Sequence, residues 1–290
     1  MRINTCINGL TARRHLGRAT GDTADVLRQL GSGLRVSRAA DDSAGLAVGI
    51  GLQADVRVLD QAVRNASDGI SLLQTADGYL EAAGDLLIRM RELVMNHLNG
   101  TLDKGSLQHL QQEYSSLLEH FNDITAGARF NDTRLLDGTG GQVSVQVGTG
   151  TDSHDAVAID LSRNIRMRPV NYRPGQPVLD WARGVTTEID QVSAQVLQLR
   201  ADWGAVHNRL EGVVRSLQQE SANLAVAGSR ILDADVAEAQ ARLIAGRVRQ
   251  RAASVVLVKG KLSPQNVVRL LKPGILLSGM PSGLLFPPPR

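Results

Sequence analysis

Apolar side chains recur every seven positions between Asp42 and Leu98. One seam contains Leu52, Leu59, Ala66, Leu73, Leu80, Leu87 and Val94. A second seam contains Val56, Val63 and Ile70, followed by Asp77, Gly84 and Arg91. This heptad spacing is typical of one long helix that packs against other helices, and at about 1.5 Å per residue it would be on the order of 80 Å long. The polar members of the second seam indicate a kink, a subunit contact or a turn of that seam toward solvent.

A second long heptad pattern runs from Leu179 to Leu232. Its first seam contains Ile189, Val196, Trp203, Leu210, Leu217, Leu224 and Ile231. Its second seam contains Val192, Leu199, Val206, Val213 and Ala227, with Glu220 as the exception. Two helices of equal length with facing apolar stripes predict an antiparallel coiled-coil pair.

The segment between the two long helices changes its period. Apolar residues from Leu107 to Ile124 are three or four positions apart, which predicts a helix that folds back on the first long helix. Two alternating runs, 143–147 and 157–161, flank a loop rich in Gly and Asp, so a β-hairpin is expected over 142–162. Asn131-Asp132 and Asp137-Gly138 are turn signals, and 163–177 reads as a connector.

Both ends of the chain carry weaker helical patterns. Residues 1–34 form a weakly amphipathic helix that Gly31-Ser32-Gly33 interrupts, and Val236–Val258 is helical in period but basic. Such helices are marginal in water without packing partners. The expected fold is therefore mainly α: a long antiparallel helical rod with a small β-hairpin region, whose terminal helices pair at one end.

The amino-acid composition and the distribution of charge limit the classes of function that the chain is expected to have. Aromatic residues make up 3% of the 290 residues, the formal net charge is +3, and no Asp or Glu follows Glu238. A basic coiled-coil protein that binds nucleic acid through 242–272 is one hypothesis, but the lack of stacking aromatics there and the mild charge argue against it. Cys6 alone cannot form an intramolecular disulfide. We find neither an apolar signal-peptide core nor a run of about 18 apolar residues, so neither a cleaved signal nor membrane insertion is expected.

No set of residues indicates catalysis or a cofactor. The six histidines are scattered, and surface or helix-packing positions are expected for them. The carboxylate pairs Asp41-Asp42 and Asp233/Asp235 favour helix caps over metal ligands. Gly31-Ser32-Gly33 follows no strand, so it indicates a helix break and not a phosphate loop. We expect no catalytic, cofactor-binding or metal site, and no enzyme activity.

Several motifs resemble those of the bacterial flagellins, and the resemblance covers about residues 1–271. The matching stretches are Met1–Thr5, Leu30–Arg35, Ala39–Ala47, Gln61–Ala76, Arg89–Leu93, Phe130-Asn131, Leu135–Gly138, Arg230–Asp235 and Ser263–Val267. The resemblance implies a structural subunit that polymerises into the extracellular flagellar filament for motility. It also implies export by the flagellar type III route, an export chaperone, and flagellar cap and hook-associated proteins as partners. A hook–filament junction protein is the alternative within the same superfamily, but the 39–47 and 61–76 matches favour a flagellin.

The resemblance also divides the chain. Residues 1–40 and 236–271 look like the two halves of an inner core domain that becomes ordered on polymerisation, and 41–178 with 179–235 look like a rod domain. The connector 163–177 stands where larger flagellins carry outer variable domains, so this chain resembles a compact flagellin without them. Residues 272–290 extend past the usual family end and are expected to lack regular structure.

Two sets of site residues follow. The resemblance implies a site for Toll-like receptor 5 on the outer face of the rod, at Arg89, Leu93 and Glu113, with Asn96 in place of the usual Gln. We expect copies of the chain to contact one another through apolar residues of the terminal helices. These are Ile3, Ile7, Leu10, Leu27, Leu30, Leu34, Val255, Val258, Val267, Leu270 and Leu271.

Overall fold

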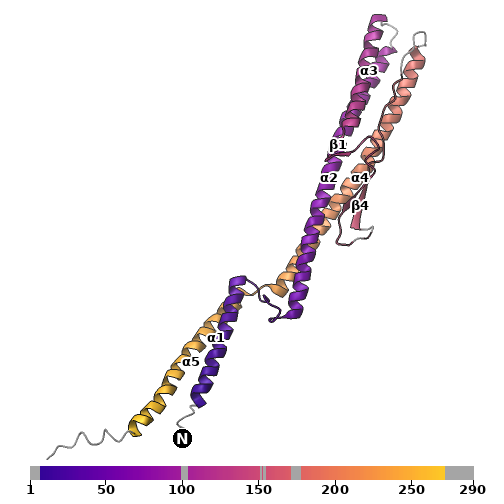
Figure 1. Ribbon diagram of the computed structural model, residues 1–290. Helices are drawn as coiled ribbons and strands as arrows, with labels where there is room; N and C mark the ends of the chain where they lie inside the picture. The colour runs from indigo at the N-terminus through magenta and orange to yellow at the C-terminus, as the bar shows by residue number, and fades with distance from the viewer. Residues whose placement is uncertain (1–6, 99–103, 151, 153–154, 171–177, 272–290) are drawn as a thin grey trace, which may run out of the picture. The chain divides into compact units, whose positions relative to one another are not determined.

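The computed structural model of the chain describes residues 7–98, 104–150, 152, 155–170 and 178–271 (Figure 1). The chain divides into two compact units. Residues 1–50 and 228–290 form what we call the terminal unit, and residues 51–227 form the central unit. Ile3, Cys6 and the tail 272–290 lie outside the described residues, as do the side chains of Val267, Leu270 and Leu271.

The central unit is built on two long helices, α2 (Ser43–His97) and α4 (Val178–Leu232), with α3 (Lys104–Gly127) beside α2 (Figure 1). The predicted pair of long helices is confirmed. Both heptad seams contribute to a single continuous core, because residues seven apart return to the same side of a helix. Its members include Leu59, Leu73, Leu80, Leu87, Val94, Ile189, Val196, Trp203, Leu210 and Leu217.

The polar positions of the second α2 seam face α4. Asp77 accepts two hydrogen bonds from the Arg200 guanidinium, at 2.7 and 3.1 Å, and Arg91 pairs with Asp190 at 3.2 Å. The partner numbers fall as the α2 numbers rise, which shows that the helices are antiparallel. Both ion pairs link α2 to α4, but the side chains of Asp77 and Arg91 stay about half exposed, at 47% and 56%, so these positions lie at the edge of the contact between the two helices.

Two small antiparallel sheets lie after α3. Strands β1 (Arg129–Phe130) and β2 (Thr133–Arg134) are joined by Asn131 and Asp132, whose φ angles of 46° and 66° form the expected tight turn. Strand β3 (Gln142–Gln146) pairs with β4 (Ala156–Asp160), with Val145 opposite Val157. Val157, Ile159 and Leu161 point into the core, so the predicted hairpin is confirmed.

The first part of the expected connector belongs to the core. Ile165 and Met167 are buried. The Asn122 side chain of α3 accepts a hydrogen bond from the Met167 amide at 3.2 Å and donates one to the Met167 carbonyl at 3.3 Å. The segment after the hairpin is therefore fixed to α3 as an extended strip.

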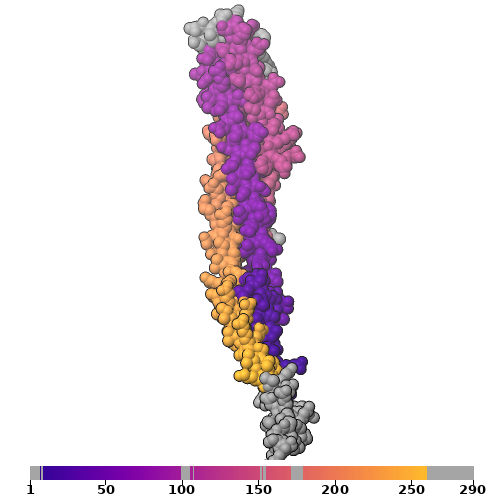
Figure 2. Space-filling model, turned by 90° about the vertical axis from the view of Figure 1, so that its left-hand side faces the viewer, coloured from indigo at the N-terminus to yellow at the C-terminus, as the bar shows by residue number. Residues whose placement is uncertain are grey.

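The terminal unit is an antiparallel pair of helices, α1 (Ile7–Ser32) and α5 (Val236–Leu271), which lie side by side in Figures 1 and 2. The Gln250 side chain donates hydrogen bonds to the Ala19 carbonyl and to Thr23 Oγ1, both at 3.2 Å. A Cβ on Gly246 would lie 2.7 Å from Thr23 Oγ1, so glycine permits the close approach. The expected pairing of the terminal helices is confirmed.

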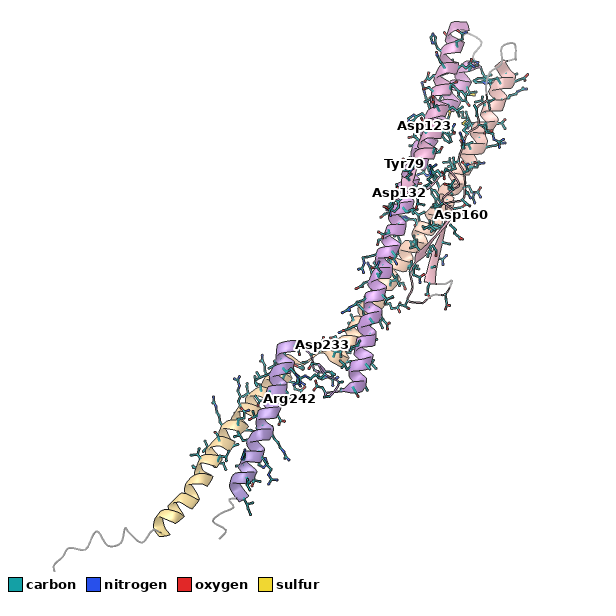
Figure 3. All side chains as sticks on the ribbon, in the orientation of Figure 1. Tyr79, Asp123, Asp132, Asp160, Asp233 and Arg242 are labelled. Atoms are coloured by element: carbon teal, nitrogen blue, oxygen red, sulfur yellow. The ribbon has the colours of Figure 1, made fainter. Side chains whose placement is uncertain are left out.

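One member of each carboxylate pair, Asp42 and Asp235, caps a helix. Asp42 Oδ1 accepts a hydrogen bond from the Gly45 amide at 2.9 Å at the start of α2. Asp235 Oδ1 accepts from the amides of Ala237 and Glu238, at 2.9 and 3.1 Å, at the start of α5. These bonds satisfy amides that have no partner within the helix. Asp233, labelled in Figure 3 where α4 gives way to α5, pairs through its backbone with Leu34.

Candidate functional site

Large aliphatic side chains of the terminal unit are exposed. Of the residues expected in self-assembly, Ile7 is 62% exposed, Val258 60%, Val255 54%, Leu10 52% and Leu27 47%. Leu30 and Leu34 are half-buried. Exposed aliphatic groups gathered on one element are typical of an interaction surface.

Helix α5 has two apolar faces. Ala239 and Gly246 are buried, and they lie on the side of α5 that carries the Gln250 contact to α1. The opposite side carries a stripe with the four-three-four-three spacing of a coiled-coil seam. Its members are Ile244, Val248, Arg251, Val255 and Val258, all exposed, and we call them the outer stripe. Ile244 and Val248 are not among the residues predicted for self-assembly, although their spacing from Val255 and Val258 in the sequence indicates the same stripe.

The contact between α1 and α5 buries mostly small side chains. Its buried members are Ala12, Ala19, Thr23 and Ala239. Stabilisation by burial scales with apolar area, at about 25 cal/mol per Å², so alanines contribute little. Leu16, Leu243 and Leu257 are half-buried. Other large aliphatic groups of the two helices, such as Leu10, Ile244 and Val248, are exposed and leave their apolar area available to other molecules.

The expected receptor residues are only partly brought together. The Arg89 guanidinium on α2 pairs with Glu113 on α3 at 2.8 Å and with Glu92 at 3.1 Å. The hydrogen bond that Arg89 donates to Glu113, and then the one that it donates to Glu92, raises the pKa of Arg89. Both Arg89 and Glu113 remain about half exposed, with side-chain exposures of 50% and 44%.

The expectation that Leu93 lies on the outer face is wrong. Leu93 is 2% exposed and belongs to the same core cluster as Tyr114 and Leu118 of α3. The cause is the position of α3, which covers this side of α2. Arg89 and Glu113 alone of the three expected residues present their side chains to solvent, and receptor recognition itself stays a prediction.

An aromatic cluster joins three helices of the central unit. The His97 ring of α2 lies 4.7 Å from the Trp181 ring of α4, and Tyr114 of α3 meets Trp181 edge-on at 5.8 Å. The Trp181 indole donates a hydrogen bond to the Val170 carbonyl at 2.8 Å. Burial lowers the pKa of His97, while burial and the nearby Glu188 carboxylate raise the pKa of Tyr114 to about 12.

The lowered pKa of His97 predicts a pH-dependent stability. Below about pH 6.5 the unfolded chain gains a proton at His97 that the folded chain resists, so stability is full above that pH and is lost as pH falls through the folded pKa. A His97→Phe variant should lose less thermal stability between pH 7.5 and 5 than the natural chain. Thermal unfolding followed by circular dichroism tests this, with His207→Gln on the surface as the control. A natural chain and a His97→Phe variant with identical pH profiles would contradict the assignment.

No group of three or more metal-ligating side chains is present within the described part of the chain. Among the same residues, no helix is both long and apolar enough to cross a membrane.

Sequence comparisons match both halves of the chain. A pattern for the bacterial flagellin N-terminal helical region matches residues 3–140, and one for the bacterial flagellin C-terminal helical region matches residues 186–271. The chain is 34% identical to a flagellin of Halalkalibacterium halodurans, over 94% of this chain and 100% of that protein. It is 32% identical to a flagellin of Bacillus subtilis, again over 94% and 100%.

Solved structures share the fold. A protein described as flagellar hook-associated, from Vibrio parahaemolyticus, superimposes with a TM-score of 0.57 at 16% identity, over 67% of this chain and 100% of that chain. At this identity the likeness concerns the arrangement of helices alone.

Proposed function

The chain belongs to the bacterial flagellin family, and we propose from that premise that its copies join through the outward aliphatic faces of the terminal unit. It is a structural subunit that polymerises into the flagellar filament, which is extracellular. The alternative of a nucleic-acid-binding protein is not favoured. The exposed outer stripe of α5 is the observation that carries the proposal, because it leaves a coiled-coil seam without a partner among the described residues.

The proposal gives the terminal unit a coupled folding and assembly role. The side chains that are fully buried on α1 and α5 are mainly alanines, so we expect the two helices to stabilise each other only weakly. Neighbouring copies would add the missing apolar contacts, so the terminal helices would gain most of their order on assembly. We propose residues 1–40 and 236–271 as the inner core domain and 41–235 as the remainder. The division into compact units, after Ile50 and before Gly228, supports a boundary of this kind.

Membership in the flagellin family is the basis on which we propose the remaining partners and the export route. We propose that the chain leaves the cell by the flagellar type III route with an export chaperone, and that it meets cap and hook-associated proteins in the flagellum. A non-enzymatic role follows in the same way, because flagellins are structural proteins.

Seeded polymerisation tests the assembly proposal. Purified chain is added to short fragments of its own filament, and growth is followed by sedimentation and electron microscopy. Elongation from the seeds is expected. Protein that stays soluble with seeds, at concentrations where a relative's flagellin elongates, would contradict the assembly proposal.

We also propose that the free subunit is recognised by Toll-like receptor 5 through Arg89 and Glu113. The ion pair between α2 and α3 supports this, since half-exposed guanidinium and carboxylate groups are suited to an interface. Arg89→Ala is expected to weaken the response of a receptor reporter cell by about tenfold, in line with the loss of one interfacial arginine. Arg215→Ala, an exposed arginine on α4, is the control. Equal responses to Arg89→Ala and the natural chain would rule out this contact.

A further inference from the structure

Charge is unevenly distributed along the helix pair of the terminal unit. We call residues 7–21 and 243–259 the free end, and residues 22–42 and 230–242 the connector end. The free end carries seven basic residues and no Asp or Glu: Arg13, Arg14, Arg18, Arg247, Arg249, Arg251 and Lys259. The connector end carries seven acidic and five basic residues, so the two ends differ in the sign of their net charge.

The basic side chains of the free end are exposed, and none forms an ion pair with another described residue. At the connector end, by contrast, two arginines form ion pairs with acidic residues. Arg28 pairs with Asp25 at 2.9 Å and with Asp41 at 3.3 Å, and Arg242 pairs with Glu238. Figure 3 labels Arg242 in α5.

Outside those ion pairs the connector end exposes three acidic groups, Asp22, Asp233 and Asp235, and three basic groups, Arg35, Arg38 and Arg230. The formal net charge is therefore −2 at the connector end, from seven acidic and five basic residues, and +7 at the free end, from seven basic residues and no acidic one. Within one chain the two surfaces cannot meet, because they lie at opposite ends of the same antiparallel helix pair.

Arg251 makes the free-end charge relevant to assembly. It occupies one position of the outer stripe, between Val248 and Val255. Packing this stripe against another helix removes the guanidinium from water, which is costly unless an opposite charge is nearby. Like charges on the other basic residues would also repel as copies approach.

We propose that the free end of one copy docks on the connector end of another, where Asp22, Asp233 and Asp235 supply the opposite charge. This inference rests on the proposed assembly function. A contact between two different surfaces of the same chain is heterologous, and repeated contacts of this kind produce an open helical array. The charges would set which surfaces meet, and the aliphatic stripe would supply most of the affinity.

Charge reversal with mixing tests the docking. One variant carries Arg247→Glu and Arg251→Glu, and the other carries Asp22→Arg and Asp233→Arg. Asp235 is left unchanged because it caps α5. Each variant alone should elongate seeds at least about tenfold more slowly than the natural chain, since like charges then face each other. An equal mixture should recover elongation to within about threefold, because each variant's reversed end now meets its complement.

Other outcomes overturn the inference. If only the arginine variant is impaired, the basic end meets a different anionic group and not the connector end. If neither variant is impaired, the charges do not direct assembly. If both are impaired and the mixture is not rescued, the two surfaces do not meet. Elongation by the natural chain in the same assay separates these results from a failure of the assembly function itself.

Salt provides a second readout that does not depend on the variants folding well. For the natural chain, elongation should slow as sodium chloride rises from about 0.05 to about 0.3 M, because the Debye length falls below about 8 Å. An elongation rate that is constant or rises over this range would contradict an electrostatic contact.

Discussion

Replacement of Ile244, Val248, Val255 and Val258 by serine is expected to reduce seeded elongation by at least about a hundredfold. Each side chain is at least half exposed in the single chain, so the substitutions remove little that holds one molecule together. Full burial of one such side chain is worth about 1.5–3 kcal/mol, and about 1.4 kcal/mol changes an equilibrium tenfold. Even partial burial of four of them accounts for the expected loss. Sedimentation of filaments grown from natural seeds measures it.

The chain supplies a matched control for this experiment. Val256 lies on the same helix and is 55% exposed, but it falls outside the outer stripe. Val256→Ser should therefore elongate nearly as the natural chain does. The central unit should melt at the same temperature in all variants. A Val256→Ser variant as defective as the fourfold variant would show that general apolarity of α5, and not the stripe, drives assembly.

Phe121→Ala is expected to destabilise the central unit by about 3–5 kcal/mol. Phe121 is 0% exposed and lies in the core that α3 shares with α2 and α4. For a unit of this size the melting temperature should fall by about 10 °C. Thermal unfolding followed by circular dichroism measures the change.

Ile88→Ala is the control for the core substitution. Ile88 is on α2 but 62% exposed, so its replacement should alter stability by no more than about 0.5 kcal/mol. Equal melting temperatures for Phe121→Ala and the natural chain would show that α3 is not part of the cooperative unit.

The sequence predicts the elements that have a strong period. The heptads place the long helices within one residue of the observed α2 and α4, because a stripe repeated over many turns cannot be accommodated by another structure. The alternation of Val143, Val145, Val157 and Ile159 predicts the hairpin for the same reason. Asp42 and Asp235 were correctly expected as caps, since the cap needs only local sequence.

Contacts between distant segments were not predictable in the same way. Met167 has no periodic neighbours, and its burial depends on Asn122, which lies 45 residues away. Leu93 was placed on the wrong side because the position of α3 around α2 is set by packing, not by spacing along α2. The pairing of Asp77 with Arg200 likewise needed the relative alignment of two helices that are far apart in sequence.

The small buried area between α1 and α5 links the ordering of these two helices to growth of the filament. Because the fully buried side chains Ala12, Ala19 and Ala239 supply little apolar area, we expect the two helices to be only weakly paired in a dilute solution of single molecules. Contacts with neighbouring subunits would stabilise the folded terminal helices by mass action. The concentration of subunits at the growing end of the filament would then determine when these helices become ordered.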